Sequence, residues 1–322
     1  FVNSGFKARL DKDYRRFKYE LDKNLLAVLV SKNSENITKI YHVGSLGFSM
    51  YSVDTFNMHG QLSNIKENDL LRNQVKTKTD IVAELTTNHF GDTERLQNLI
   101  IKSKMAGASF IKLQKRQVKT FYPSEKLKQH YKSPFGNTFG DYRKGLELTH
   151  EQFCFVDDLC KRIGIGWFAS VLDIPSYKFI KEFEPDLFKL PSTISQHVEL
   201  FDYVKRNHKR SLVISTGKTG KKFENEIISK FVALDKLYLL QCTSAYPTQI
   251  SDANIAVISH YAKIGQSQRN LIPGYSSHDL GSLCSMLAIA AGAKMIEKHV
   301  KFGSVSWSHF DDVAVDLMRD DF

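Results

Sequence analysis

Two histidines and two lysines are the residues of this sequence that first indicate chemistry. His278 and His299 each follow a short apolar run, and Lys112 and Lys189 lie inside two others. The simpler interpretation of a lone histidine is a polar residue whose hydrogen bonds are made within the protein. A pair of histidines on neighbouring strand ends instead favours a metal site for Mn²⁺. Imidazole ligands alone do not exclude zinc or iron. A buried lysine is costly without an anionic partner. A ligand that carries phosphate and carboxylate groups would offset that cost.

A carboxylate and a set of hydroxyls fall at similar positions. Glu84 ends an apolar run, where it could orient a water molecule or transfer a proton. Asn88 and His89 extend this polar cluster. The alternative is that the segment is only a turn that enters a helix, with Asp92 as the N-cap. This alternative explains Asp92 but not Glu84. Gly217 would let backbone N–H groups approach a phosphate. The candidate hydroxyl donors are Ser170, Ser192, Ser215 and Ser276.

Eight short apolar runs must position these side chains. They alternate with amphipathic segments such as Thr93–Ala106, Glu151–Ile163 and Ser282–Ala291, which predicts βαβ units and a parallel sheet. Eight units favour a closed (β/α)8 TIM barrel of the α/β class over a Rossmann sheet, because no GxGxxG follows the first run. The polar residues would then share the rim where barrel active sites lie. The runs are Ile81–Leu85, Phe110–Leu113, Gly166–Ala169, Leu187–Leu190, Leu212–Ser215, Leu237–Leu240, Ile272–Tyr275 and Met295–Lys298.

Two regions do not follow this alternation. Residues 1–79 are predicted to be a small N-terminal appendage to a barrel domain of residues 80–322, either a hairpin that closes the barrel bottom or a separate module. Within the appendage, Leu10–Leu26 is expected to be helical, and Leu25–Val30 and Ile37–Val43 to be strands. The long connection Lys115–Thr149 is either a lid or binding loop, or disordered.

Composition narrows the class of protein. Hydrophobic residues make up 42% and charged residues 25%, and no run approaches the roughly 20 apolar residues of a membrane span. Four cysteines without a CxxC pair, and no signal peptide, predict reduced thiols in a cytoplasmic protein. The net charge of +10 fits a basic surface and an anionic substrate better than nucleic acid, since no zinc-finger or RNA-binding signature accompanies it.

An ordered series of motifs resembles the sialic acid synthase family. The segment AELTTNHFGD resembles AEIGxNHxGD of that family, and GASFIKLQ is similar to GADAVKFQ. Further along, LFKLPST resembles YKIGSGE, VISTGK resembles ILSTGM, and LQCTSAYPT resembles LHCTSxYPT. Finally, GYSSHDLG resembles GLSDHTxG and IEKHV resembles xEKHF. The matches follow the family order from about Ile81 to Val300.

The resemblance implies a TIM-barrel enzyme that condenses phosphoenolpyruvate with an N-acylated hexosamine, such as N-acetylmannosamine, to a nonulosonic acid and phosphate. It implies a divalent metal, Mn²⁺ with Mg²⁺ or Co²⁺ as alternatives, on His278 and His299, and pairing into homodimers. Glu84, Lys112 and Lys189 would act in catalysis. Gln114 and Tyr246 match positions that line the substrate pocket. The positions that match phosphoenolpyruvate-binding residues are Lys112, Ser170, Lys189, Ser192, Ser215 and Ser276.

Three departures from the family pattern concern the sugar. Ile194 stands where a sugar-contacting glutamate is usual, which favours another aldehyde or a shifted contact. The family's GPDH segment is replaced by residues 307–312, so Asp311 or Asp312 would supply its acid. The sequence ends at Phe322, so either its C-terminus is truncated or the antifreeze-like domain of the family is absent. In the second case Arg116, Arg143 or the appendage would recognise the acyl group of the sugar. The alternatives are a sister synthase that uses a different sugar, phosphorylated or not, and a non-catalytic sugar-phosphate-binding barrel.

Overall fold

The computed structural model describes residues 79–305, 307 and 311–318, with the backbone only at 311, and the backbone of five strands between residues 7 and 52. The chain divides into two compact units, residues 1–79 and 80–322. Each unit is described by itself. No helix among the described residues is long and apolar enough to cross a membrane.

The first unit contains an antiparallel sheet in the order β1-β2-β3-β4-β5. The helix expected over Leu10–Leu26 is wrong, because strands occupy this stretch. The sequence of β2, Arg-Phe-Lys-Tyr-Glu-Leu, alternates polar and apolar residues with a period of two, which is typical of a strand. The five strands are Lys7–Asp11, Arg16–Leu21, Asn24–Leu29, Lys39–Gly44 and Gly47–Ser52.

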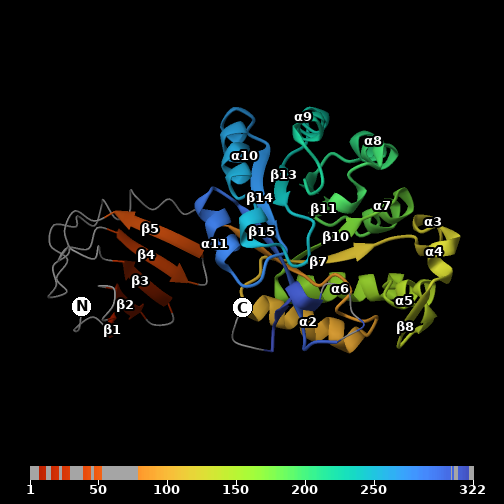
Figure 1. The fold of residues 1–322 in the computed structure, drawn as a ribbon, viewed down its shortest axis with the longest axis horizontal. Helices are drawn as coiled ribbons and strands as arrows, with labels where there is room; N and C mark the ends of the chain where they lie inside the picture. Colours follow the sequence, from red (N-terminus) through yellow and green to blue (C-terminus); the bar gives the residue numbers. More distant parts are fainter. Residues whose placement is uncertain are drawn as a thin grey trace. The chain divides into compact units, whose positions relative to one another are not determined.

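The second unit is a closed parallel barrel, which confirms the predicted fold class (Figure 1). Its strands follow chain order around the barrel, and closure comes from β15, which pairs in parallel with both β14 and β6. A short β16 (Val315–Asp316) adds to the outer part of β15. All eight predicted runs are strands: β6 Asp80–Glu84, β7 Phe110–Lys115, β10 Gly166–Val171, β11 Leu187–Leu190, β12 Ser211–Ser215, β13 Leu237–Cys242, β14 Leu271–Ser277 and β15 Met295–Lys301.

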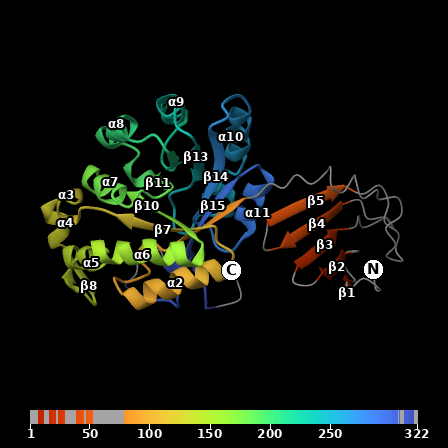
Figure 2. The same cartoon turned by 180° about the vertical axis from the view of Figure 1, so that it is seen from behind.

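Helices surround this barrel, as the reverse view also shows (Figure 2). Local sequence fixes their ends. In α6, Thr149 and Gln152 form a capping box at the start, and Gly164 adopts the left-handed conformation at the end. Most of their apolar faces pack on the outer side of the strands in one large core cluster, and the buried residues of α11 belong to a second cluster. These helices are α2 Thr93–Met105, α6 His150–Ile163, α7 Ile174–Lys181, α8 Val198–Asn207, α9 Lys221–Lys230, α10 Ala256–Ser267 and α11 Leu283–Ala290.

The interior of the barrel has an apolar lower layer and a polar upper layer. Because side chains alternate across a strand, residues two apart on one strand point to the same side. Val82 lies below Glu84 on β6, and Leu187 lies below Lys189 on β11. The lower layer is a buried cluster of Val82, Phe168, Leu187, Val213, Tyr238, Leu240 and Met295. The polar side chains therefore lie above this apolar layer, at the C-terminal ends of the strands.

The connection after β7 is folded. It contains α3 (Val118–Phe121), α4 (Ser124–Lys128), the hairpin of β8 (His130–Ser133) and β9 (Gly136–Thr138), and α5 (Phe139–Gly145). A capping box between Thr138 and Asp141 begins α5.

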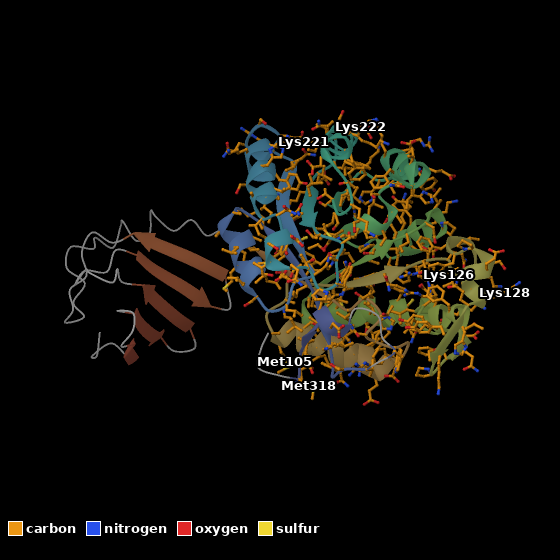
Figure 3. All side chains as sticks on the ribbon, in the orientation of Figure 1. Met105, Lys126, Lys128, Lys221, Lys222 and Met318 are labelled. Carbon is orange, nitrogen blue, oxygen red and sulfur yellow. The ribbon has the colours of Figure 1, made fainter. Side chains whose placement is uncertain are left out.

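Much of the basic charge lies on the outside of the molecule. Figure 3 shows Lys126 and Lys128 of α4 and Lys221 and Lys222 of α9 extending away from the ribbon, and all four are exposed. The four cysteines are free, and only Cys154 is exposed among them.

Candidate active site

Two lysines and two glutamates form a buried network of ion pairs at the rim. Lys112 Nζ lies 2.7 Å from Glu84 Oε1 and 2.9 Å from Glu297 Oε1. Lys189 Nζ lies 2.7 Å and 2.9 Å from the two oxygens of Glu297. Ser276 Oγ donates to Glu297 Oε1 at 2.8 Å. Both lysines are therefore paired. The carboxylates of the protein itself offset the cost of burying these lysines, which we had expected an anionic ligand to offset.

The pKa values of this network follow from its geometry. Burial raises the pKa of the Glu297 carboxyl, but the two ammonium groups outweigh burial and hold it well below its usual range. Burial lowers the pKa of Lys112, yet Glu297 and Glu84 together raise it above its usual value. For Lys189, burial outweighs the attraction of Glu297 and lowers the pKa. An ammonium has three donors. Each lysine thus keeps an N–H for a ligand.

The two histidines face each other beside this network, with ring centroids 5.6 Å apart. His278 Nδ1 lies 2.8 Å from the carbonyl oxygen of Thr243, and His299 Nδ1 lies 2.9 Å from Thr86 Oγ1. Nε2 is therefore the ring atom that each histidine can offer to a ligand, although Nε2 of His278 also lies 3.0 Å from the Tyr246 hydroxyl. Burial lowers the pKa of His299 to about 4, so its ring is neutral at pH 7.

This donor set fits a divalent ion that takes two imidazoles. Engagement of Nδ1 by an oxygen acceptor or hydroxyl is the arrangement that orients metal-binding histidines. No group of three His, Cys, Asp or Glu side chains suited to an ion occurs in the part of the chain that the structure describes. Further ligands to an ion would be water or substrate oxygens.

The network and the histidines line a cavity of about 360 Å³. The folded connection after β7 supplies one wall of it through Arg116, Phe121, Tyr122 and Arg143. Arg116 Nε lies 3.1 Å from Glu147 Oε1, and Arg116 Nη1 donates to the Tyr122 hydroxyl at 2.5 Å. The connection is therefore folded, not disordered, and it lines the cavity, while its role as a lid or binding loop stays a prediction.

Most of the predicted site residues line this one cavity. The structure brings together Glu84, Lys112, Gln114, Ser170, Lys189, Ser192, Ser215, Tyr246, Ser276, His278 and His299. Gly217 lies at the same place. A Cβ added there would stand 2.4 Å from Ser244 Oγ and 3.0 Å from Ser192 Cβ, so no larger residue fits without a shift.

Other predicted residues lie elsewhere. Asn88 is buried and its Nδ2 donates to the carbonyl oxygen of Val300 at 2.9 Å, outside the cavity. Asp312 is exposed and does not line the cavity. The side chain of Asp311 lies outside the described residues. The structure thus brings no acid of residues 307–312 to the site among the side chains it describes.

Ile194 does not face the cavity. It lies in a short 3-10 turn, Ser192–Ile194, where it is buried in the main core cluster. Its neighbours Ser192 and Thr193 line the cavity. The tight turn points consecutive side chains in different directions, so the residue available for a sugar contact is Thr193.

Among the residues of the cavity that sequence reasoning missed, Glu297 and Cys242 contact predicted site residues most directly. Glu297 stands two residues before His299 on β15, so the period of two already placed both side chains on one face. Cys242 ends β13, and its Sγ lies 3.7 Å from His278 Nδ1. The same period relates it to Leu240 of the barrel floor.

Comparisons with known proteins agree with this arrangement. The NeuB family model matches residues 99–320. The N-acetylneuraminate-9-phosphate synthase of Mus musculus is 33% identical over 240 residues, which cover 73% of this chain and 65% of that protein. A pseudaminic acid synthase of Campylobacter jejuni is 32% identical over 233 residues, or 69% of this chain and 65% of that protein. The chain thus spans about two thirds of the length of these relatives.

A solved structure supports the fold. The N-acetylneuraminic acid synthetase of Leptospira borgpetersenii, in complex with citrate, superposes with a TM-score of 0.64 at 23% identity. The alignment covers 75% of this chain and 79% of that one.

Proposed function

The chain belongs to the NeuB family, and on this premise we propose that it is an enzyme that joins phosphoenolpyruvate to a sugar aldehyde. The products would be a nonulosonic, sialic-type keto-acid and phosphate. The acceptor would be N-acetylmannosamine or a related hexosamine. The names of the relatives support this class of reaction, since they include an N-acetylneuraminate-9-phosphate synthase and a pseudaminic acid synthase.

The observation that carries the proposal is the buried network of Lys112, Lys189, Glu84 and Glu297. Two ammonium groups at the closed end of a cavity supply donors to the phosphate and carboxylate of phosphoenolpyruvate. Glu297 bridges both lysines and keeps them close together. Ser215 Oγ is buried and has no hydrogen-bond partner, so it offers a further donor to the same ligand.

The reaction balances with groups that the cavity contains. C3 of phosphoenolpyruvate forms a bond to the aldehyde carbon, and the aldehyde oxygen takes a proton. Water adds to C2 and loses one proton, which gives a tetrahedral C2 that carries a hydroxyl and the phosphate. The bond between C2 and the phosphate oxygen then breaks as the hydroxyl becomes the keto group, and the hydroxyl proton leaves with the phosphate. Glu84 is suited to hold that water and accept its proton, because Lys112 and Thr86 both hold its Oε1 and thereby orient the carboxylate. Lys112 and Lys189 would stabilise the charge that develops on the phosphate.

A divalent ion held by His278 and His299, Mn²⁺ first with Mg²⁺ or Co²⁺ as alternatives, would supply Lewis-acid polarisation of the aldehyde oxygen. The neutral ring of His299 and the engaged Nδ1 atoms of both rings support this assignment. The family premise further leads us to propose a homodimer that acts in the cytoplasm, which size-exclusion chromatography and cell fractionation would test.

The test of the function is release of inorganic phosphate from phosphoenolpyruvate. With Mn²⁺ and a panel of aldoses, at least one acceptor should give stoichiometric phosphate and keto-acid. Lys189→Met should weaken binding of phosphoenolpyruvate by about tenfold or more, because it removes a charged donor. Binding of the sugar should change far less. A panel without turnover, together with no binding of phosphoenolpyruvate in calorimetry, would reject the proposal.

A further inference from the structure

A second cavity of about 380 Å³, here called the side cavity, lies between the end of β7, the connection that follows it and the start of α7. Side chains alternate along a strand, so Lys115 points to the opposite side of β7 from Gln114, which lines the cavity of the active site. The side cavity is therefore on the outer face of the strand and separate from the barrel interior, although Arg116 lines both cavities.

Cations outnumber carboxylates in the side cavity. Among the residues that the structure describes, its cations are Lys115, Arg116, Lys119 and Lys144, and its one carboxylate is Glu147. Lys115 Nζ lies 3.5 Å and Arg116 Nε lies 3.1 Å from the Glu147 carboxylate, so this group already has two cationic partners. Lys119 and Lys144 are exposed, and neither forms an ion pair within residues 79–305. The side cavity thus has two positive charges without a counter-charge.

A buried hydroxyl without a partner also lines the side cavity. Ser176 is 2% exposed, and its Oγ makes no hydrogen bond within the described part of the chain. The backbone N–H of Ser176 donates to Asp173 Oδ1 at 2.8 Å, and that of Gln117 donates to Asp173 Oδ2 at 2.7 Å. Helix α7 is therefore already capped, and the free donor is the Ser176 hydroxyl. A buried polar group without a partner costs about 1–3 kcal/mol, which a ligand that accepts from it would offset.

One wall of the side cavity is apolar and holds a lysine in place. Lys115 Nζ lies 4.9 Å from the ring centroid of Phe179 and donates to the carbonyl oxygen of Leu148 at 2.8 Å. Val118 and Pro175 belong to the same lining. An anionic group can therefore lie among the lysines and the hydroxyl while an apolar part of the same ligand packs against the ring. The volume is within the range of cavities that bind small molecules.

We propose that the side cavity binds a small molecule that carries a phosphate monoester and an apolar ring. The ammonium groups of Lys119 and Lys144 would bind the phosphate as point charges, and Ser176 Oγ would donate to one of its oxygens. A phosphate monoester carries close to two negative charges and matches both lysines, whereas a carboxylate matches only one. The inference does not depend on the proposed function, because neither the lysine network nor the two histidines line this cavity.

Calorimetric titration of the full chain with phenyl phosphate tests the site, since this probe combines both features. The wild type should bind it, and the double variant Lys119→Gln with Lys144→Gln should weaken that binding by about tenfold to a hundredfold. Lys221→Gln with Lys222→Gln is the matched control, because it removes two exposed lysines from α9 (Figure 3) and should leave the affinity within about twofold. No binding by the wild type, or an equal loss in the control, would overturn the inference.

Two analogues of phenyl phosphate test the class of ligand. Inorganic phosphate keeps the charge and lacks the ring, so it should bind about tenfold more weakly to the wild type. Benzoate keeps the ring and carries a single charge, so it should also bind about tenfold more weakly. Equal affinity for either analogue would overturn the ligand class that we propose.

Lys189→Met separates the side cavity from the cavity of the active site, which also has donors for a phosphate. This variant should weaken only a binding event at the active site and leave the event that depends on Lys119 and Lys144. The inference fails if Lys189→Met abolishes all binding of phenyl phosphate and the double variant behaves like the wild type. None of these titrations needs turnover, so failure of the proposed function would not change their result.

Ser176→Ala tests the buried donor. It should weaken binding of phenyl phosphate by about threefold to tenfold. Denaturant unfolding of the ligand-free variant should show no loss of stability, because the hydroxyl has no partner to lose. Ser124→Ala, at an exposed position of α4, is the control and should change neither value. Unchanged affinity for phenyl phosphate in Ser176→Ala would reject the site as proposed.

Discussion

Glu297 lies between two lysines and holds both. Its Oε1 is 2.7 Å from Lys189 Nζ and 2.9 Å from Lys112 Nζ, and all three side chains are almost fully buried. These residues come from β15, β11 and β7, so the contact exists only once the barrel has closed. The carboxylate neutralises charge that would otherwise oppose folding, and at the same time it places two donors side by side.

Glu297→Gln should destabilise the protein by about 3 kcal/mol, because removal of one partner from a buried ion pair leaves uncompensated charge. Denaturant unfolding would measure the change. Phosphoenolpyruvate should restore more stability to the variant than to the wild type, since it replaces the lost anion. Asp158→Asn, which breaks an exposed pair with Arg162, is the control and should have little effect. Equal stability of Glu297→Gln and wild type would refute this role.

His278→Ala should remove stoichiometric Mn²⁺ binding, because it takes away one of the two imidazoles that face each other at 5.6 Å between centroids. Equilibrium dialysis with metal analysis measures this directly and does not depend on turnover. His260→Ala removes an exposed imidazole on α10 and should leave the metal content unchanged. Retention of one equivalent of Mn²⁺ by His278→Ala would count against the ligand assignment.

Ile194→Glu should lower the free energy of unfolding by more than about 2 kcal/mol, because it buries a carboxylate in the apolar core. Thr193→Glu places the same group on the exposed neighbour that lines the cavity. This second variant should fold normally and change the KM for the sugar. If Ile194→Glu folded with wild-type stability and altered sugar affinity, Ile194 would face the substrate after all.

His89 should make stability depend on pH. Burial lowers its pKa to about 4 from a usual 6.5, so the unfolded chain binds a proton that the folded chain does not. The contribution of neutral, buried His89 to the free energy of unfolding is complete above pH 6.5. It declines as the pH falls toward 4 and is lost below pH 4. The shift corresponds to at most about 3 kcal/mol.

Unfolding titrations of wild type and His89→Gln at pH 4 to 7 would measure this. Their difference in stability should narrow as the pH falls, whereas His260→Gln should run parallel to the wild type because His260 is exposed. Parallel curves for His89→Gln would show that another group carries the pH dependence.

The sequence by itself determined the barrel and most of its rim. A period of two along each apolar run places Glu84 above Val82 and Lys189 above Leu187, whatever the rest of the chain does. Alternation of these runs with amphipathic segments then requires a parallel sheet. The residues predicted at the strand ends, such as Ser170 and His299, therefore share one cavity.

Only the tertiary structure decided which charges meet. Ion pairs between β7, β11 and β15 depend on closure of the barrel, so the sequence left Lys112 and Lys189 without visible partners. The direction of Ile194 depends on a single 3-10 turn, which a strand pattern does not describe. Arg143 follows the end of β7 by about thirty residues, and folding of the intervening segment brings its side chain to the cavity. Contacts between residues that are distant in the chain determine which side chains meet in the cavity, because local periodicity fixes only the side of a strand on which a residue lies.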